Sequence, residues 1–327
     1  MGSEGAKAYF IVGGAGFIGS HFCDALLARP DCRGVTIYDN FSSGRDWHFA
    51  HHLADARFSV VRGDVHERDR LTAAMRGHDV VIHLASNPDI ARAMTEPDID
   101  FREGTALTNG VVEAMRVSGV GRILYASGSG VYGEAADVEF REDHHPMQPI
   151  STYGASKLAG EALICAYSHM FGITGLCFRF GNVVGPRQTH GVGFDFVKRL
   201  VSDPTRLRIL GDGSQNKSYI AVDDVIAAVL HASERTPGGF ATYNVATGDT
   251  ITVLEIAGLA VDLVVGRRDR TTFEFTGGDR GWKGDVPIVR INIDAIRALG
   301  WPGARPAREA MRWSMASMLA DVKKGLL

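Results

Sequence analysis

A tyrosine and a lysine four residues apart are the first residues in this sequence whose types and spacing could do chemistry. They are Tyr153 and Lys157, in the segment Tyr-Gly-Ala-Ser-Lys. On a helix, positions i and i+4 lie on the same face. The lysine ammonium favours the phenolate form of the tyrosine, which can then act as a general base on an alcohol hydroxyl. The pattern is common by itself, so its meaning depends on the rest of the chain.

A glycine-rich segment near the N-terminus provides that context. Gly13, Gly16 and Gly19 follow a short apolar run and open a helical pattern. Glycines at this spacing permit a tight turn and let the backbone approach a pyrophosphate, which the N–H groups of the helix N-terminus then bind. The segment therefore predicts a dinucleotide site.

An acidic residue about 20 positions further on indicates which dinucleotide is bound. Asp39 ends the second expected strand, where its carboxylate can accept both ribose hydroxyls and would repel a 2′-phosphate. NAD is therefore expected rather than NADP. The expected cofactor contacts lie at the ends of the first four strands and on the reactive helix. They are Gly13, Gly16, Phe17, Ile18, Gly19, Asp39, Asn40, Ser42, Gly44, Asp64, Val65, Leu84, Ala85, Ser86, Tyr153 and Lys157.

Alternating strands and helices must position these residues. We expect strands at 9–12, 35–38, 58–61, 80–84, 122–126 and 174–180, and helices at 105–117 and 153–171. This alternation predicts an α/β fold with a Rossmann-type, doubly wound parallel sheet. After about residue 180 the alternation loosens. We expect an NAD-binding domain at 7–180 and a smaller C-terminal α/β substrate-binding domain at 181–327, with some chain returning to the sheet.

Composition excludes several other classes of function. The 327 residues have a formal net charge of −3, which gives no general attraction to nucleic acid or to an anionic membrane. No apolar run is long enough to cross a bilayer, and the four cysteines are scattered, as expected for free thiols in a cytoplasmic protein. No metal site is expected, because the adjacent pairs His51-His52 and His144-His145 should not face one ligand. His83 is expected to be a packed core histidine.

Several segments together resemble a known family. They are GGAGFIGSH at 13–21, YDN at 38–40, GDV at 63–65, HLAS at 83–86, VYG at 131–133, YGASK at 153–157, RFGNVVGPRQ at 179–188 and VDDV at 222–225. Over about residues 8–225 the chain resembles an extended short-chain dehydrogenase/reductase of the NAD-dependent epimerase/dehydratase family. Within that family it most resembles the UDP-glucose 4-epimerase group.

The triplet before Val131 indicates which reaction to expect. In the 4,6-dehydratases of this family the triplet is Thr-Asp-Glu, whose acid and base eliminate water, whereas this chain has Gly128-Ser129-Gly130. The resemblance then implies NAD-dependent 4-epimerisation of a UDP-sugar through a transient 4-keto intermediate. UDP-glucose/galactose and UDP-glucuronate/galacturonate are both candidate substrates. A net nucleotide-sugar dehydrogenase or reductase is one alternative, and an NAD(H)-binding sensor with a degraded active site is another.

Two positions depart from the family pattern. Gly128 stands where the resemblance implies a catalytic Ser or Thr, so Ser127 and Ser129 are the candidate replacements and Ser129 is preferred. Tyr153 working without either serine remains open. Gly104 stands where many relatives carry an Asn.

The resemblance also implies substrate contacts and a partner. Asn182, Lys217 and Arg280 would contact the diphosphate, and the two cations among them favour such an anion. Leu210 would lie against the uracil ring or belong to the ordinary core. Arg187 would reach the sugar end, which would suit a uronic acid. Relatives commonly pair through the helices near 105–118 and 153–171, so a homodimer with a four-helix interface is expected.

Overall fold

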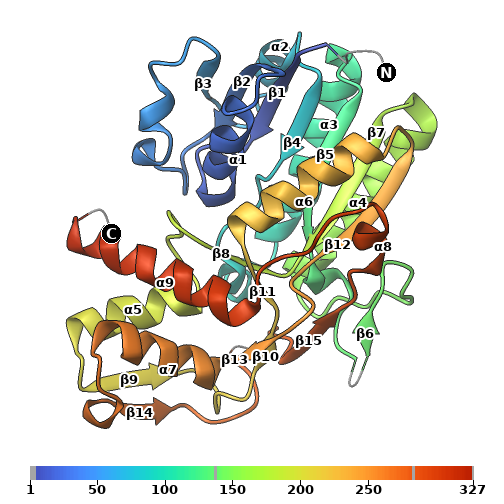
Figure 1. The fold of residues 1–327 in the computed structure, drawn as a ribbon. Helices are drawn as coiled ribbons and strands as arrows, with labels where there is room; N and C mark the ends of the chain where they lie inside the picture. The colour runs from blue at the N-terminus through green and yellow to red at the C-terminus, as the bar shows by residue number, and fades with distance from the viewer. Residues whose placement is uncertain (1–4, 136–137, 282–283, 326–327) are drawn as a thin grey trace. The chain divides into compact units, whose positions relative to one another are not determined.

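The computed structural model describes residues 5–135, 138–281 and 284–325 (Figure 1). The chain divides into two compact units. The first contains the described residues up to Val131, together with Thr152–Arg179 and Val229–Tyr243. The second contains the described residues of Tyr132–Ser151, Phe180–Ala228 and the chain from Asn244 onward. Each unit is thus built from separate stretches of sequence.

A seven-stranded sheet forms the centre of the first unit, in the order β12-β7-β5-β4-β1-β2-β3. The strands are β1 (Lys7–Val12), β2 (Cys32–Asp39), β3 (Phe58–Arg62), β4 (Val80–His83), β5 (Arg122–Gly128), β7 (Thr174–Phe180) and β12 (Phe240–Val245). Strand β1 pairs in parallel with β2 and β4, β2 with β3, and β4 with β5. This confirms the predicted Rossmann-type sheet. The strand order reverses between β1 and β4, the place where such sheets bind ligands.

Helices cover the sheet (Figure 1). Helices α2 (Arg68–Met75), α3 (Leu107–Ser118) and α4 (Thr152–Phe171) share one apolar core with the strands. Helix α1 (Phe17–Leu27) lies on the other face. The helix expected at 105–117 is α3, which begins at Leu107 because a π-helix over Phe101–Ala106 precedes it. The long helix expected at 153–171 is α4, one residue longer at its start.

The second unit contains short strands and further helices. They are β6 (Glu139–Phe140), β8 (Asn182–Val184), α5 (Val192–Ser202), β9 (Arg206–Ile209), β10 (Asn216–Lys217), β11 (Tyr219–Ala221), α7 (Val253–Val264), β13 (Ile251–Thr252), β14 (Thr272–Phe275), β15 (Ile288–Ile291), α8 (Asp294–Ala298) and α9 (Ala307–Lys323). Helix α6 (Val222–Arg235) begins in this unit and ends in the first. The strands form a four-stranded sheet in the order β13-β10-β15-β6 and two two-stranded sheets.

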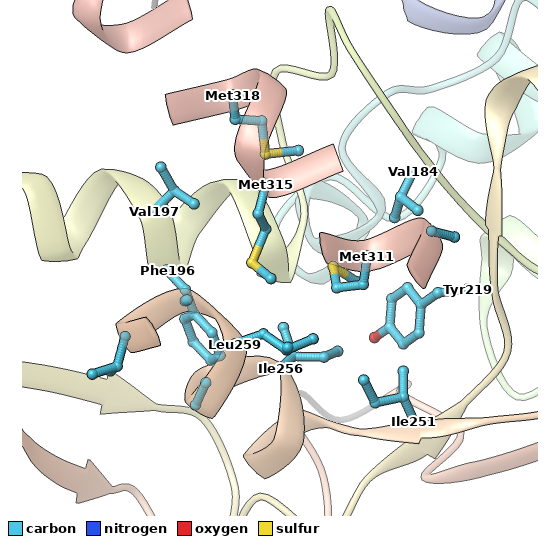
Figure 2. Close-up of a cluster of buried hydrophobic side chains, with 14 of the residues drawn as sticks. Val184, Phe196, Val197, Tyr219, Ile251, Ile256, Leu259, Met311, Met315 and Met318 are labelled. Carbon is cyan, nitrogen blue, oxygen red and sulfur yellow. The ribbon is translucent and has the colours of Figure 1, made fainter. Parts of the chain in front are cut away.

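A second apolar core holds this unit together (Figure 2). Met311, Met315 and Met318 recur at helical spacing on α9 and are buried in this core with residues of α5 and α7. Flexible methionine side chains fill irregular gaps well, as a junction of three helices requires. Each unit therefore has an apolar core of its own.

Two expectations concern the cysteines and membrane-spanning segments. All four cysteines are free, and Cys23, Cys32 and Cys177 are buried. Among the described residues, no helix is both long and apolar enough to span a membrane.

Candidate active site

The glycine loop between β1 and α1 shows why its glycines are needed. Gly13 has a φ of +81°, and a Cβ there would lie 2.7 Å from the backbone nitrogen of Ala85. A Cβ on Gly19 would lie 2.6 Å from the Cα of Gly14. Gly16 differs, because the nearest atom to a Cβ would be 3.5 Å away. The chain's own packing requires Gly13 and Gly19, whereas Gly16 leaves space beside the helix N-terminus for a ligand.

The N-terminus of α1 is suited to a phosphate. Gly16 is the N-cap, no side chain caps this end, and the first turn contains no acidic residue. The backbone N–H groups of such a turn and its positive dipole end attract anions. Phe17 and Ile18 occupy this turn and are half-buried. The loop thus fits the pyrophosphate of a dinucleotide.

Asp39 lies at the end of β2 and holds the glycine loop in place. Its Oδ2 accepts a hydrogen bond from the N–H of Ala15 at 2.9 Å, and its Oδ1 accepts one from Phe41 at 2.7 Å. Burial raises the pKa of Asp39, and these two N–H groups partly offset that shift. Each carboxylate oxygen can accept a further bond, so both remain able to bind ribose hydroxyls. Close packing of Gly44 on Ala15 brings the loop after β2 over the glycine loop.

Residues of β2 and β3 meet beside this loop. Asn40 donates from Nδ2 to Asp64 Oδ2 at 3.0 Å, and its Oδ1 accepts from the N–H of Ser42 at 3.0 Å. The Tyr38 hydroxyl donates to the backbone oxygen of Asp64 at 2.8 Å, and Val65 is buried next to it. At the end of β4, the N–H groups of Leu84 and Ala85 both donate to the backbone oxygen of Val12. Ser86 follows them and is half-buried. The expected cofactor residues therefore gather at the carboxyl ends of four neighbouring strands.

The reactive pair lies on α4 in the first unit. Lys157 Nζ is 5.5 Å from the ring centroid of Tyr153 and 5.2 Å from that of Tyr125. It also donates to the backbone oxygen of Ala126 at 2.8 Å and is only 3% exposed. A buried ammonium thus lies beside the phenol, at the end of β5. The structure thus places a candidate general base and a buried cation close together on one helix.

A buried ion pair supports the end of β5, and sequence reasoning missed it. Glu161 Oε1 accepts a hydrogen bond from the Ser127 hydroxyl at 2.5 Å. Glu161 also pairs with Arg179 of β7, whose Nη2 lies 2.7 Å from Oε2. Glu161 continues the four-residue spacing of Tyr153 and Lys157, a signal that was present in the sequence.

The two candidate serines have different surroundings. Ser127 is buried and donates its hydroxyl to Glu161, whereas Ser129 is half-buried in the short 3-10 helix Ser129–Val131. A Cβ at Gly128 would have no atom within 4 Å. The chain's packing therefore does not require glycine at the position where the family has a hydroxyl.

Gly104 now has a physical explanation. It lies in the π-helix before α3, and a Cβ there would be 2.5 Å from Ser156 Oγ and 2.7 Å from Ser156 Cβ. The Ser156 hydroxyl itself donates to the backbone oxygen of Tyr153. The glycine lets this helix approach α4 closely, directly behind the reactive pair.

His83 is a core histidine, as predicted. It is fully buried, and its Nε2 lies 3.0 Å from the Thr108 hydroxyl. Burial, followed by the charge of Lys157, lowers the pKa of His83 to about 3. The imidazole is therefore neutral at physiological pH and serves as structure rather than as an acid.

The expectation that the neighbours His51 and His52 would not face one ligand is contradicted. The Nε2 atoms of both lie within hydrogen-bond distance of the same atom, Asp24 Oδ1, at 2.8 and 2.6 Å. A one-turn 3-10 helix over Ala50–His52 brings both rings to one side, which adjacent residues on an extended chain could not do.

Three of the expected substrate contacts lie together in the second unit. Lys217 pairs with Asp285, whose backbone oxygen also accepts from Arg280 at 3.1 Å. Arg280 pairs through both Nη atoms with Glu134, at 2.8 and 3.0 Å. Leu210 adjoins this group and is 45% exposed, so its interpretation as ordinary core is wrong. Sequence reasoning missed the two carboxylates because they are distant in the chain from the cations.

The other two expected contacts lie in the same unit. Asn182 begins β8, is exposed, and donates from its backbone and its side chain to the Ser218 backbone oxygen. Arg187 has a φ of +65°, unusual for a residue other than glycine, and its charge acts on the Asp321 carboxyl. The bonds from Asn182 thus reach the residue next to Lys217 in the chain.

Known proteins with this arrangement can now be compared. Residues 9–246 match the model of the NAD dependent epimerase/dehydratase family. The chain is 33% identical to the UDP-glucose 4-epimerase of Mycolicibacterium smegmatis over 299 residues, which cover 89% of this chain and 92% of that protein. It is 30% identical to a dTDP-glucose 4,6-dehydratase of an Actinoplanes species, over 90% of this chain and 92% of that protein.

A solved structure agrees along nearly the whole chain. The crystal structure of a UDP-galactose 4-epimerase superposes with a TM-score of 0.83 at 32% identity, covering 98% of this chain and 100% of that one. The family match spans both the glycine loop and the Tyr153/Lys157 helix. The chain therefore belongs to the NAD dependent epimerase/dehydratase family.

Proposed function

We propose that this chain catalyses the NAD-dependent 4-epimerisation of a UDP-sugar. The observation that carries the proposal is the pairing of Tyr153 with a buried Lys157 beside a strand end that lacks carboxylates. The residues at that end are Gly128-Ser129-Gly130. A dehydratase needs an acid and a base there to eliminate water. Oxidation and re-reduction at one carbon need neither.

The chain's own residues account for the proton transfers. NAD, held at the glycine loop and Asp39, supplies the hydride acceptor and donor. Tyr153 takes the proton from the O4 hydroxyl while Lys157 stabilises the phenolate, and Ser129 donates a hydrogen bond to the sugar oxygen. The 4-keto sugar then turns about its diphosphate linkage and presents its other face. Tyr153 returns the proton to O4, so the overall reaction involves no net oxidation.

We assign the contacts to the rest of the substrate in the same proposal. Asn182, Lys217 and Arg280 contact the diphosphate, and the exposed side chain of Leu210 lies against the uracil ring. Arg187 reaches the sugar end, where its planar guanidinium would suit a carboxylate. UDP-glucuronate is therefore one of the substrates to test.

The test is turnover of UDP-glucose, UDP-galactose and UDP-glucuronate, with products resolved by chromatography. We expect conversion to the C4 epimer without a net change of absorbance at about 340 nm, because the nicotinamide ends each cycle as it began. A steady absorbance change would indicate a net dehydrogenase or reductase. No product from any UDP-sugar would contradict the proposal.

Replacement of Tyr153 tests the chemistry directly. Tyr153→Phe removes the general base and should lower kcat by about 10²–10⁴-fold. It should leave NAD binding intact, since the glycine loop and Asp39 are unchanged. The cofactor retained by the purified variant is the control. An unchanged kcat in this variant would show that Tyr153 is not the general base, whereas absence of turnover in the unmodified protein would support a sensor.

The homodimer belongs to this proposal as well. Large apolar side chains remain exposed on the helices expected at the interface, namely Val117, Met170 and Phe171. Burial of such side chains in a four-helix interface would be favourable. Sedimentation of the purified protein tests this assignment.

The cytoplasmic location remains a prediction.

A further inference from the structure

Three side chains from two separate segments converge on the surface of the first unit. Asp24 comes from α1, and His51 and His52 come from the 3-10 helix Ala50–His52. The two imidazole rings lie 4.0 Å apart, and both Nε2 atoms face Asp24 Oδ1. One ligand atom from each residue lies within 4.8 Å of the other two.

The two histidines differ in their surroundings. The His52 side chain is 15% exposed and packs at 5.6 Å from the Phe58 ring, whereas the His51 side chain is 53% exposed. His52 is thus held by the core, and the side of the cluster next to His51 is open to solvent. Two oriented imidazoles and a carboxylate with one open side are characteristic of a metal site that retains a water ligand.

We propose that Asp24, His51 and His52 bind a divalent transition-metal ion, and that Zn²⁺ fits these ligands best. Bonds of about 2.0–2.1 Å in tetrahedral geometry place neighbouring ligand atoms about 3.3 Å apart. The Nε2 atoms of His51 and His52 now lie 2.8 and 2.6 Å from Asp24 Oδ1. These two distances need to widen only slightly to admit the ion. Imidazole and carboxylate ligands suit Zn²⁺, whereas Mg²⁺ and Ca²⁺ prefer oxygen ligands alone.

Binding also requires a rearrangement of protons. An Nε2 that now donates to Asp24 must lose that proton or shift it to Nδ1 before it can coordinate the ion.

The ion would brace one part of the first unit. Helix α1 starts at the glycine loop, and Ala50–His52 lies a few residues beyond the segment that packs on Ala15. His48, from the same region, also contacts the Ala15 backbone oxygen, at 2.9 Å. A metal joining Asp24 to His51 and His52 would therefore secure this segment to α1. The ion takes no part in the proposed epimerisation.

Titration of the protein with Zn²⁺ after chelator treatment tests the proposal. The protein must carry no histidine tag, because such a tag would bind the same ion. Calorimetry should show one ion per chain. His52→Ala and Asp24→Asn should each weaken binding about tenfold or more. His169→Ala, which removes an exposed histidine of α4, should leave binding unchanged. Co²⁺ in the same site should give the visible absorption of a tetrahedral ion, and each ligand variant should lose it.

Thermal unfolding provides a second readout. Saturating Zn²⁺ should raise the Tm of the unmodified protein and of His169→Ala, but not that of His52→Ala. Unfolding in chelator shows whether each variant is folded. Equal Zn²⁺ affinity in the unmodified protein and in His52→Ala would overturn the proposal, as would the absence of binding.

Discussion

Two serines flank Gly128, and their hydrogen bonds separate their roles. Ser127 directs its hydroxyl into the protein, to a carboxylate that also pairs with Arg179. A donor used in this way is not available to a substrate, and the buried Glu161 would lose a partner if it turned away. Ser129 is half-buried and has no such commitment among the described hydrogen bonds. At the residue scale we therefore assign the substrate hydrogen bond to Ser129.

Alanine at each serine should give opposite results. Ser129→Ala should lower kcat with little change in stability. Ser127→Ala should lower the free energy of unfolding by about 1–3 kcal/mol, because a buried carboxylate loses a donor, and should affect kcat less. Steady-state kinetics and urea unfolding of both variants provide the measurements.

Gly128 offers a control for this assignment. Because a Cβ there meets no atom within 4 Å, Gly128→Ser should fold normally. The double variant Gly128→Ser and Ser129→Ala should regain part of the activity that Ser129→Ala loses. If Ser127→Ala abolishes turnover while its stability is unchanged, the assignment to Ser129 is wrong.

At the scale of elements, α4 holds two consecutive residues of β5. Lys157 donates to the Ala126 backbone oxygen, and one turn later Glu161 accepts from the Ser127 hydroxyl. The strand end next to the reactive phenol is therefore fixed to the helix that carries the phenol. This arrangement keeps catalytic groups from two elements in register, as a preorganised site requires.

The contact between the π-helix and α4 depends on one glycine. Gly104→Ala would force a methyl group against Ser156, which lies 2.5–2.7 Å from the new Cβ. Such overpacking should lower the free energy of unfolding by about 1–3 kcal/mol and shift α4 behind Tyr153. Urea unfolding and kcat should both report the change.

A double substitution distinguishes this contact from a general effect of alanine. Ser156→Gly removes the opposing side chain, so the pair Gly104→Ala and Ser156→Gly should lose less stability than the sum of the single variants. Strictly additive losses would mean that the two residues do not oppose each other.

At the scale of the whole molecule, the sequence predicted what neighbouring residues determine. The strands at 58–61 and 174–180, the glycine loop and the Tyr153/Lys157 helix each follow from local spacing, and the structure contains them. Contacts between distant segments could not be predicted in this way. The pairing of Lys217 with Asp285 and of Asp24 with the histidine pair depends on the path of the chain through its units. The π-helix was missed because apolar spacing does not distinguish it from an α-helix.

The second unit shows how distant segments make one charged group. Glu134 comes from the first of its three chain segments, Lys217 from the second, and Arg280 and Asp285 from the third. Lys217 and Arg280, the two proposed diphosphate contacts in this group, each already pair with a carboxylate. A diphosphate that binds there must compete with those carboxylates for the cations.

This competition predicts that removal of a carboxylate improves nucleotide binding. Asp285→Asn leaves Lys217 without its anionic partner, so UDP should bind about fivefold more tightly, the effect of about 1 kcal/mol from a partly exposed charge pair. Asp269→Asn is the matched control, because Asp269 is exposed and pairs with Arg267, which is not a proposed diphosphate contact. Calorimetric titration with UDP at two salt concentrations should show the gain for Asp285→Asn and its reduction by salt. Weaker UDP binding by Asp285→Asn would instead show that Asp285 positions Lys217 for the substrate rather than competing with it.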